Sequence, residues 1–125
     1  FRPFAPAVLE EDAQKYFEID QKSEHMLIAF NARKKYDNKI SATVHVDGSS
    51  RVQTVNKISN KQFYSLIREF KKKTGISVLL NTSFNIKGQP IVNSPEDAIK
   101  CFLKYKIDYL VLDEYLVNKN WWIKN

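Results

Sequence analysis

The sequence is poor in cysteine, glycine and proline, with one Cys, three Gly and four Pro among 125 residues. The single cysteine, Cys101, cannot form a disulfide within the chain, so nothing indicates a disulfide-stabilised secreted domain. No apolar run approaches the roughly 20 residues that a membrane-spanning helix requires. The opening residues, FRPF, lack the basic segment and apolar core of a signal peptide. We therefore expect a cytoplasmic protein that does not enter a membrane.

Common catalytic and phosphate-binding motifs are missing as well. There is no Walker loop and no G-x-G-x-x-G segment. His25 and His45 have no partners at metal-ligand spacing, so no metal site is expected within the chain. A triad of Ser83, His45 and Asp47 can be written down, but the spacing gives it no support. No catalytic residue can be assigned from these patterns.

The composition is that of an ordinary globular domain, with 43% hydrophobic and 27% charged residues. The length fits one domain over residues 1–125. A net charge of +6 permits nucleic acid, phosphorylated ligands or simple solubility. The basic cluster 71–73 falls at the end of a predicted helix, where cations complement the helix dipole. Nucleic acid is therefore not the favoured partner.

Hydrophobic periodicity and turn residues predict alternating helices and strands. We expect helices over about residues 9–18, from a capping box at Ser59 and Gln62 to a stop at Gly75, and from Ser94 onward. Strands are expected at 26–30, at 41–48 and 51–55 as a hairpin around Asp47-Gly48, at 76–80 as a central strand, and at 108–112. Cys101 is expected in the core. The pattern predicts an α/β (α+β) fold with a mixed sheet.

Two segments carry polar side chains where a plain core would have none. Residues 45–51 (HVDGSSR) bring a carboxylate, hydroxyls and a guanidinium to a predicted hairpin tip. Residues 81–85 (NTSFN) follow a predicted buried strand, and ligands of open α/β sheets often lie beyond strand ends. Amide and hydroxyl donors beside an arginine suit a nucleotide or an acyl phosphate. The alternative is that these residues bond only their own turns.

Five blocks occur in a characteristic order: RPFAPAVL at 2–9, HVDGSSRVQTV at 45–55, VLLNTSFN at 78–85, GQPIV at 88–92 and SPEDA at 94–98. In this series the chain resembles the C-terminal domain of the NodU/CmcH carbamoyltransferases, from Arg2 to about residue 119. The resemblance implies a YrdC-like mixed twisted sheet with flanking helices. It also implies that ATP, expected with Mg²⁺, and carbamoyl phosphate yield a carbamoyl adenylate.

The resemblance further implies a partner, the N-terminal domain of the same parent chain, which is expected to hold the metal of the parent enzyme and to transfer the carbamoyl group to an acceptor hydroxyl. Family members carry a basic, glycine-containing segment just upstream of the position of Phe1. The chain is thus expected to be excised from a longer protein and inactive alone. The tail Trp121-Trp122 is expected to meet a partner domain or to pack back on this one.

The residues that match ligand-binding positions of the family are Arg2, Arg51 and Ser83, with Asn81, Thr82 and Asn85 in the same motif. Arg2 and Arg51 are expected at phosphate or carbamoyl groups. His45 either lines the pocket or satisfies a partner in the sheet, and the second interpretation is preferred. Two other functions stay open, a YrdC-like RNA-binding module and a structural interaction domain. The chain lacks the basic stripe with interleaved aromatics typical of single-strand binding.

Overall fold

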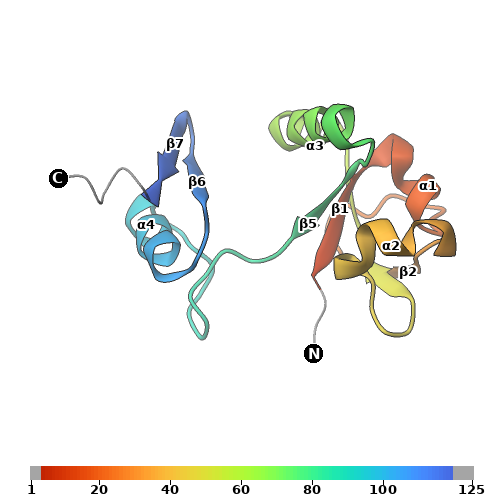
Figure 1. The fold of residues 1–125 in the computed structure, drawn as a ribbon, viewed down its shortest axis with the longest axis horizontal. Coiled ribbons are helices and arrows are strands. Elements are labelled where there is room, and N and C mark those ends of the chain that lie inside the picture. Colours follow the sequence, from red (N-terminus) through yellow and green to blue (C-terminus); the bar gives the residue numbers. More distant parts are fainter. Residues whose placement is uncertain (1–3, 120–125) are drawn as a thin grey trace. The chain divides into compact units, whose positions relative to one another are not determined.

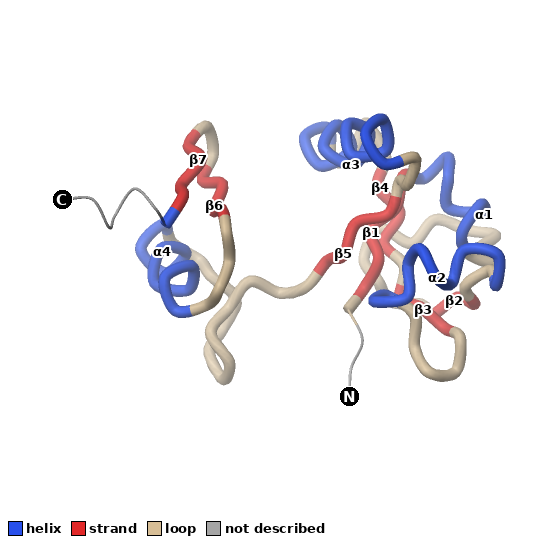
Figure 2. The backbone as a smooth tube through the Cα atoms, in the orientation of Figure 1, coloured by secondary structure: helices blue, strands red, loops and turns tan. Residues whose placement is uncertain are grey.

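The computed structural model describes residues 4–119, which form two compact units, residues 4–82 and 83–119 (Figure 1). The first unit contains five strands: β1 Ala5–Leu9, β2 Ala29–Asn31, β3 Ser49–Arg51, β4 Gln53–Val55 and β5 Val78–Asn81. Its α-helices are α1 Ala13–Tyr16, α2 Asp37–Ile40 and α3 Lys61–Thr74, and its 3-10 turns are η1 Glu10–Asp12, η2 Lys34–Tyr36 and η3 Ser41–Thr43. The second unit contains α4 Pro95–Lys104, β6 Tyr109–Leu112 and β7 Tyr115–Asn118 (Figure 2). The mixture of helices and small sheets confirms the predicted α+β class.

The main sheet of the first unit has the order β4-β1-β5, with β1 parallel to β4 and antiparallel to β5. The mixed sheet was predicted, but β1 was not. The helix expected over 9–18 is reduced to η1 and α1, and Leu9 ends a strand. The middle position within this sheet belongs to β1, so the prediction of a central strand at 76–80 is wrong: β5 is an outer strand among the described residues.

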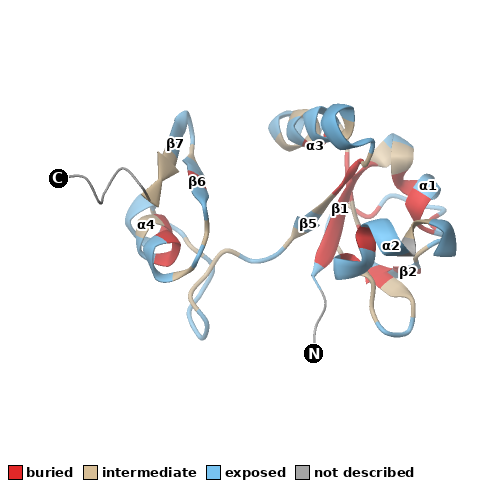
Figure 3. Ribbon diagram, in the orientation of Figure 1, coloured by how far each residue is buried: buried red, intermediate tan, exposed pale blue. Residues whose placement is uncertain are grey.

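Clusters of buried residues lie on both faces of this sheet, and its middle strand β1 is buried along its whole length (Figure 3). Val8 and Val78 point to one face, where they pack with the ring of Phe17 and other buried residues that follow β1. On the opposite face, Leu9 and Val55 pack against Ile67 of α3. Complete burial of an aliphatic side chain such as Ile67 is worth roughly 1.5–3 kcal/mol. The opposing cores hold the sheet rigidly between them.

The ends of α3 agree only partly with the sequence prediction. Asn60, not Ser59, is the N-cap, and its side-chain oxygen accepts a hydrogen bond from the Phe63 N–H at 3.1 Å. At the other end Gly75 has φ +76°, a left-handed conformation that favours glycine, and it ends the helix as predicted. Lys71 in the last turn forms an ion pair with Asp12 at 2.6 Å, which ties α3 to η1.

Two predicted strands are largely wrong. Of residues 26–30, only Ala29 and Phe30 belong to β2; Met26 has φ +54° and Leu27 is 85% exposed. Residues 41–48 form η3 and a turn, and β3 pairs with β2, so the hairpin expected around Asp47-Gly48 does not exist. The turn at Gly48 is confirmed by its φ of +84°.

The second unit is a helix packed on a two-stranded hairpin. Ser94 caps α4 as predicted, accepting a hydrogen bond from the Asp97 N–H at 3.1 Å, with Pro95 at the first position. Phe102 and Leu110 are buried between α4 and β6. Cys101 is 1% exposed on the same helix, which confirms the core position predicted for it. Trp121 and Trp122 lie outside the described residues.

Candidate functional site

One face of the main sheet is apolar at one end and polar at the other. Directly paired residues of neighbouring strands point to the same face. The register pairs Ala7 with both Gln53 and Leu79, and Ala5 with Asn81. Helix α3 covers the apolar end, where Leu79 packs into its core. Gln53 lies at the level of Leu79, across the middle strand, and Asn81 lies further toward the other end; both stay partly exposed, so polar groups gather where the helix cover stops.

Arg51 belongs to this polar end. Ser50, Val52 and Thr54 are all buried while Arg51 and Gln53 are not, so Arg51 shares the face of Gln53. Within residues 4–119 its guanidinium has no ion-pair or hydrogen-bond partner, whereas Arg33 donates to the Gln14 carbonyl. Arg51 therefore keeps all its donors available for an anion.

A side-chain hydrogen bond crosses the middle strand at this end. Asn81 Nδ2 donates to Gln53 Oε1 at 2.7 Å, although β5 and β4 are not neighbours. The amides can meet because β1 contributes only the methyl groups of Ala5 and Ala7 beneath them. Asn81 is thus held by Gln53, a residue that sequence reasoning did not single out. The available sequence signal was the spacing of two residues between Gln53 and Arg51, which places both side chains on the same face of an extended chain.

Gln53 is in turn held by the loop that follows α1. Its Nε2 donates to the main-chain oxygen of Glu24 at 3.2 Å. That loop is fixed by the buried Ser23, whose N–H donates to Thr54 Oγ1 at 2.9 Å and whose hydroxyl donates to the Val52 carbonyl at 2.8 Å. A chain of hydrogen bonds therefore leads from the core to the amide of Asn81.

The rest of the NTSFN motif crosses into the second unit. Thr82 is the last residue of the first unit, and Ser83 is the first residue of the second. Thr82 and Ser83 are both exposed. Asn85 Nδ2 donates to the carbonyls of Ile86 at 3.2 Å and Gln89 at 2.9 Å, so this amide closes the turn that contains Gly88. The sequence analysis left open that the residues of this motif bond only their own turn. For the side-chain nitrogen of Asn85, that interpretation is correct.

His45 and Asp47 do not share a strand face, because the strand expected there is a turn. Asp47 Oδ1 accepts from the Ser49 hydroxyl at 2.7 Å and from its N–H at 2.9 Å. These hydrogen bonds lower the pKa of Asp47. His45 Nδ1 lies 3.7 Å from Asp47 Oδ1 and makes no hydrogen bond within the described residues. The preferred interpretation, that His45 satisfies a partner in the sheet, is wrong.

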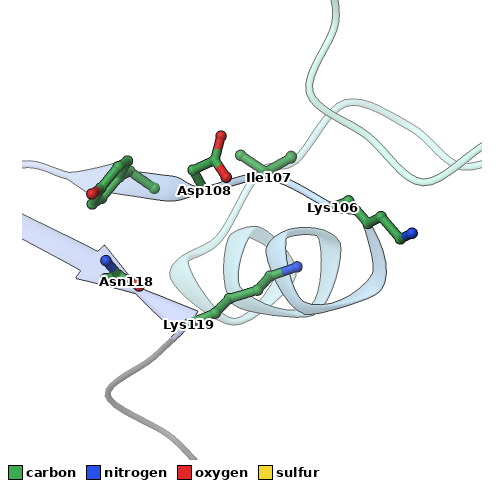
Figure 4. Close-up of a pocket in the computed structure, with 6 residues that line it drawn as sticks. Lys106, Ile107, Asp108, Asn118 and Lys119 are labelled. Atoms are coloured by element: carbon green, nitrogen blue, oxygen red, sulfur yellow. The ribbon is translucent and has the colours of Figure 1, made fainter.

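Two hollows lie in the second unit. One, of about 440 Å³, is lined by Lys106, Asp108 and Lys119 with their neighbours (Figure 4). The ammonium of Lys119 already has partners there. It donates a hydrogen bond to the Tyr105 carbonyl and lies 5.0 Å from the centre of the Phe102 ring. None of the ligand-binding residues predicted from the sequence lines this hollow.

The predicted site residues thus fall into three groups. Arg51 and Asn81 share one end of one sheet face. Ser83 and Asn85 belong to the second unit, and Thr82 lies at the junction. Arg2 lies outside the described residues. Among the side chains that the structure describes, those of residues 4–36 and 38–119, no three of His, Cys, Asp or Glu gather where they could hold a metal ion. In the same part of the chain no helix is long and apolar enough to cross a membrane.

Comparison with known proteins decides the family. The family model described as "Carbamoyltransferase C-terminus" matches residues 1–119. The chain belongs to the carbamoyltransferase C-terminus family. Arg51, Asn81 and Ser83 all lie within the matched region.

The relatives include nodulation proteins and an O-carbamoyltransferase. The nodulation protein NolNO of Sinorhizobium fredii is 44% identical over 95% of this chain and 18% of its own length. An uncharacterised protein of Synechocystis is 41% identical over 95% of this chain and 23% of its own length. The 3'-hydroxymethylcephem-O-carbamoyltransferase of Streptomyces clavuligerus is 37% identical over 80% of this chain and 19% of its own length. The chain therefore spans about a fifth of the curated relatives that it matches.

Proposed function

We propose that this chain is the substrate-activating domain of an O-carbamoyltransferase, which binds ATP and carbamoyl phosphate and forms a carbamoyl adenylate. The observation that carries the proposal is the uncommitted guanidinium of Arg51, on the same sheet face as the amides of Gln53 and Asn81. A guanidinium holds two oxygens of a phosphate at once. Amides supply the neutral hydrogen bonds that a carbamoyl group, itself an amide, can make.

The chemistry asks for positive charge rather than for a nucleophile. Formation of a carbamoyl adenylate from ATP and carbamoyl phosphate consumes one water and releases pyrophosphate and phosphate. The protein has to place a carbamate oxygen in line with the α-phosphorus and to stabilise charge on the phosphoryl oxygens. Arg51 would bind these oxygens, with the amide of Asn81 beside it on the same sheet face. The resemblance to the family assigns ligand-binding roles also to Arg2, Thr82, Ser83 and Asn85.

The proposal includes partners outside this chain. The relatives are four to six times longer than the part that this chain matches, since the match covers 17–23% of their length. We propose that residues 1–125 act as one domain of such a longer, cytoplasmic protein, and that its N-terminal domain transfers the carbamoyl group to an acceptor hydroxyl. The described residues offer no cluster of carboxylates for Mg²⁺. The expected Mg²⁺ would therefore arrive with ATP, bound through its phosphate oxygens.

The test is the release of pyrophosphate by the full-length protein supplied with ATP and carbamoyl phosphate. Arg51→Ala removes a hydrogen bond to a charged group and is expected to lower kcat/KM for carbamoyl phosphate about 10- to 150-fold. Ser83→Ala is expected to lower it as well, while circular dichroism shows an intact fold. Arg68→Ala, the matched control, removes an exposed arginine of α3 that already pairs with Glu69 and is expected to have no effect.

Full activity in both Arg51→Ala and Ser83→Ala would contradict the site assignment. Absence of carbamoyl phosphate-dependent pyrophosphate release from the wild-type protein would contradict the function itself. Steep salt-dependent binding of RNA in that case would favour the RNA-binding alternative.

A further inference from the structure

The amide of Asn81 has a fixed orientation, and a main-chain group sets it. The Glu24 carbonyl can only accept a hydrogen bond, so the Gln53 atom facing it has to be Nε2. The other end of the same amide, Oε1, then faces Asn81 and can only accept. Asn81 must therefore present Nδ2 to Gln53. The order of donors and acceptors, which begins at the Glu24 carbonyl, therefore assigns nitrogen and oxygen in both amides.

This arrangement determines what Asn81 can offer to a ligand. Its Oδ1 receives no hydrogen bond from any residue in the range 4–119, and it lies at the polar end of the sheet face with Arg51. A carbonyl oxygen in that place accepts from an N–H or O–H and repels another acceptor. Phosphate oxygens suit Arg51, whereas Asn81 Oδ1 suits a planar NH₂ group.

We propose that Gln53 is a positioning residue, which fixes the Asn81 amide with its oxygen toward the ligand so that the site selects a carbamoyl NH₂ group. This inference rests on the proposed function. It assigns a role to Gln53 and a substrate preference to Asn81. A ligand with a methyl group in place of NH₂, such as acetyl phosphate, has the same shape and the same phosphate but no N–H to donate.

Spacing favours the carbamoyl NH₂ over the amino group of adenine, which has the same hydrogen-bonding chemistry. Asn81 pairs with Ala5 of the middle strand, and Arg51 precedes by two residues Gln53, which pairs with Ala7 on the other side of that strand. Two strand spacings, about 10 Å, separate residues that flank a middle strand in this way. A spacing of this order suits a compact ligand that reaches both side chains. In carbamoyl phosphate only a carbon and an oxygen separate NH₂ from phosphorus, whereas in ATP the ribose and most of the purine intervene.

The experiment compares two ligands in the full-length protein, by pyrophosphate release. One quantity is the KM for carbamoyl phosphate, and the other is the inhibition constant of acetyl phosphate against it. Gln53→Met keeps the length of the side chain but leaves Asn81 free to turn over. The KM for carbamoyl phosphate is expected to rise about five- to tenfold, as for loss of one neutral hydrogen bond, while the inhibition constant of acetyl phosphate stays unchanged. Asn81→Leu is expected to show the same split.

Two further variants separate positioning from general damage. Gln53→Glu keeps an acceptor oxygen facing Asn81. Its negative charge weakens the binding of carbamoyl phosphate and of acetyl phosphate alike. The ratio of the KM for carbamoyl phosphate to the inhibition constant of acetyl phosphate is therefore expected to stay at the wild-type value. Gln62→Met, the same substitution at an exposed position of α3, is expected to change neither constant. These outcomes would establish that Gln53 acts through the orientation of Asn81.

Equal weakening of carbamoyl phosphate and acetyl phosphate in Gln53→Met would overturn the inference, because it would show only a loss of structure. Unchanged constants in Gln53→Met and Asn81→Leu would overturn it too. In these two variants the KM for ATP could rise while the KM for inosine triphosphate, which lacks the amino group, stays unchanged. That result would assign the contact to adenine and refute the carbamoyl assignment. A wild-type protein without carbamoyl phosphate-dependent activity would overturn the proposed function, and this inference with it.

Discussion

A single buried hydroxyl joins α1 to the beginning of β5. The ring of Tyr16 is 1% exposed, and its hydroxyl oxygen accepts a hydrogen bond from the N–H of Ser77 at 3.2 Å. Ser77 is completely buried, and its carbonyl accepts from the Leu9 N–H of β1 at 3.3 Å. Tyr16→Phe deletes one oxygen, leaves the ring in place and deprives the Ser77 N–H of its partner.

The expected effect is a loss of about 1–3 kcal/mol in the free energy of unfolding of the first unit, because a buried N–H left without a partner loses its solvation in full. For a unit of this size each kcal/mol lowers the melting temperature by about 4–8 °C. The assay is chemical denaturation followed by circular dichroism. Amide hydrogen exchange of β1 assigns the loss to the first unit.

Tyr36→Phe is the matched control. The ring of Tyr36 lies against that of Tyr16, with centres 4.9 Å apart and planes tilted by 58°, and its hydroxyl has no hydrogen bond to any of residues 4–119. It is expected to change stability by less than about 0.5 kcal/mol. If Tyr16→Phe were equally harmless, the hydrogen bond to Ser77 would contribute nothing, and the reasoning from an orphaned buried donor would fail.

Two further predictions concern charge and capping. Burial acts to raise the pKa of Asp12, but hydrogen bonds with Lys71 and Ser77 and nearby positive charge outweigh it and lower that pKa. A group whose pKa is lower in the folded than in the unfolded state stabilises the fold at pH values above its unfolded-state pKa. That stabilisation is lost as the pH falls through the folded-state pKa. Wild type should therefore lose about 1 kcal/mol more than Asp12→Asn between pH 6 and pH 3 in urea titrations, and identical losses would contradict the ion pair's role. Ser94→Ala should cost about 1 kcal/mol, seen as faster amide exchange in α4, while Ser94→Asp should retain protection; equal exchange in both variants would exclude the cap.

Local signals in the sequence predicted the elements that local chemistry controls. Ser94 and Pro95 begin α4 as expected, and Gly75 ends α3. Most of the strand predicted at 51–55 is found, since β3 ends at Arg51 and β4 spans Gln53–Val55, and Asn81 was correctly placed at the end of a strand. Each of these features depends on a few neighbouring residues and on no distant contact.

Hydrogen bonds of side chains to the backbone explain why the strand predicted at 41–48 does not form. The apolar alternation there is genuine, but Thr43 Oγ1 donates to the Ile40 carbonyl at 2.7 Å, and the Thr43 carbonyl accepts from the Ser50 hydroxyl at 2.8 Å. Such bonds offer the backbone an alternative to a ladder. Val46, which the alternation assigned to a buried face, is fully exposed.

Strand β1 was missed because it contains a proline and borders a helical pattern. Proline lacks the N–H that a ladder requires. The Leu9 N–H points toward β5, so by alternation the nitrogen of Pro6 points toward β4. On that side pairing begins only at Ala7, one residue later. The strand accommodates Pro6 where the ladder has not yet started, and a register of this kind cannot be read from one sequence.

The contact between Gln53 and Asn81 was likewise beyond sequence reasoning, since it joins strands that do not pair with each other. Only the observed register places the two amides within reach, on either side of a third strand. The sequence therefore singled out Asn81 as a candidate but not Gln53, its hydrogen-bond partner.

The small side chains of the middle strand impose an unusual requirement on this domain. At positions 5 and 7 the useful property is the absence of bulk, because a methyl group is all that fits beneath a hydrogen bond between two flanking strands. A valine at Ala5 or Ala7 would add no charge and remove no ligand, yet it would separate the two amides. Selection at these positions would act on volume alone, so on the proposed function a substitution that keeps the apolar chemistry would alter the substrate preference by adding two methyl groups beneath the site.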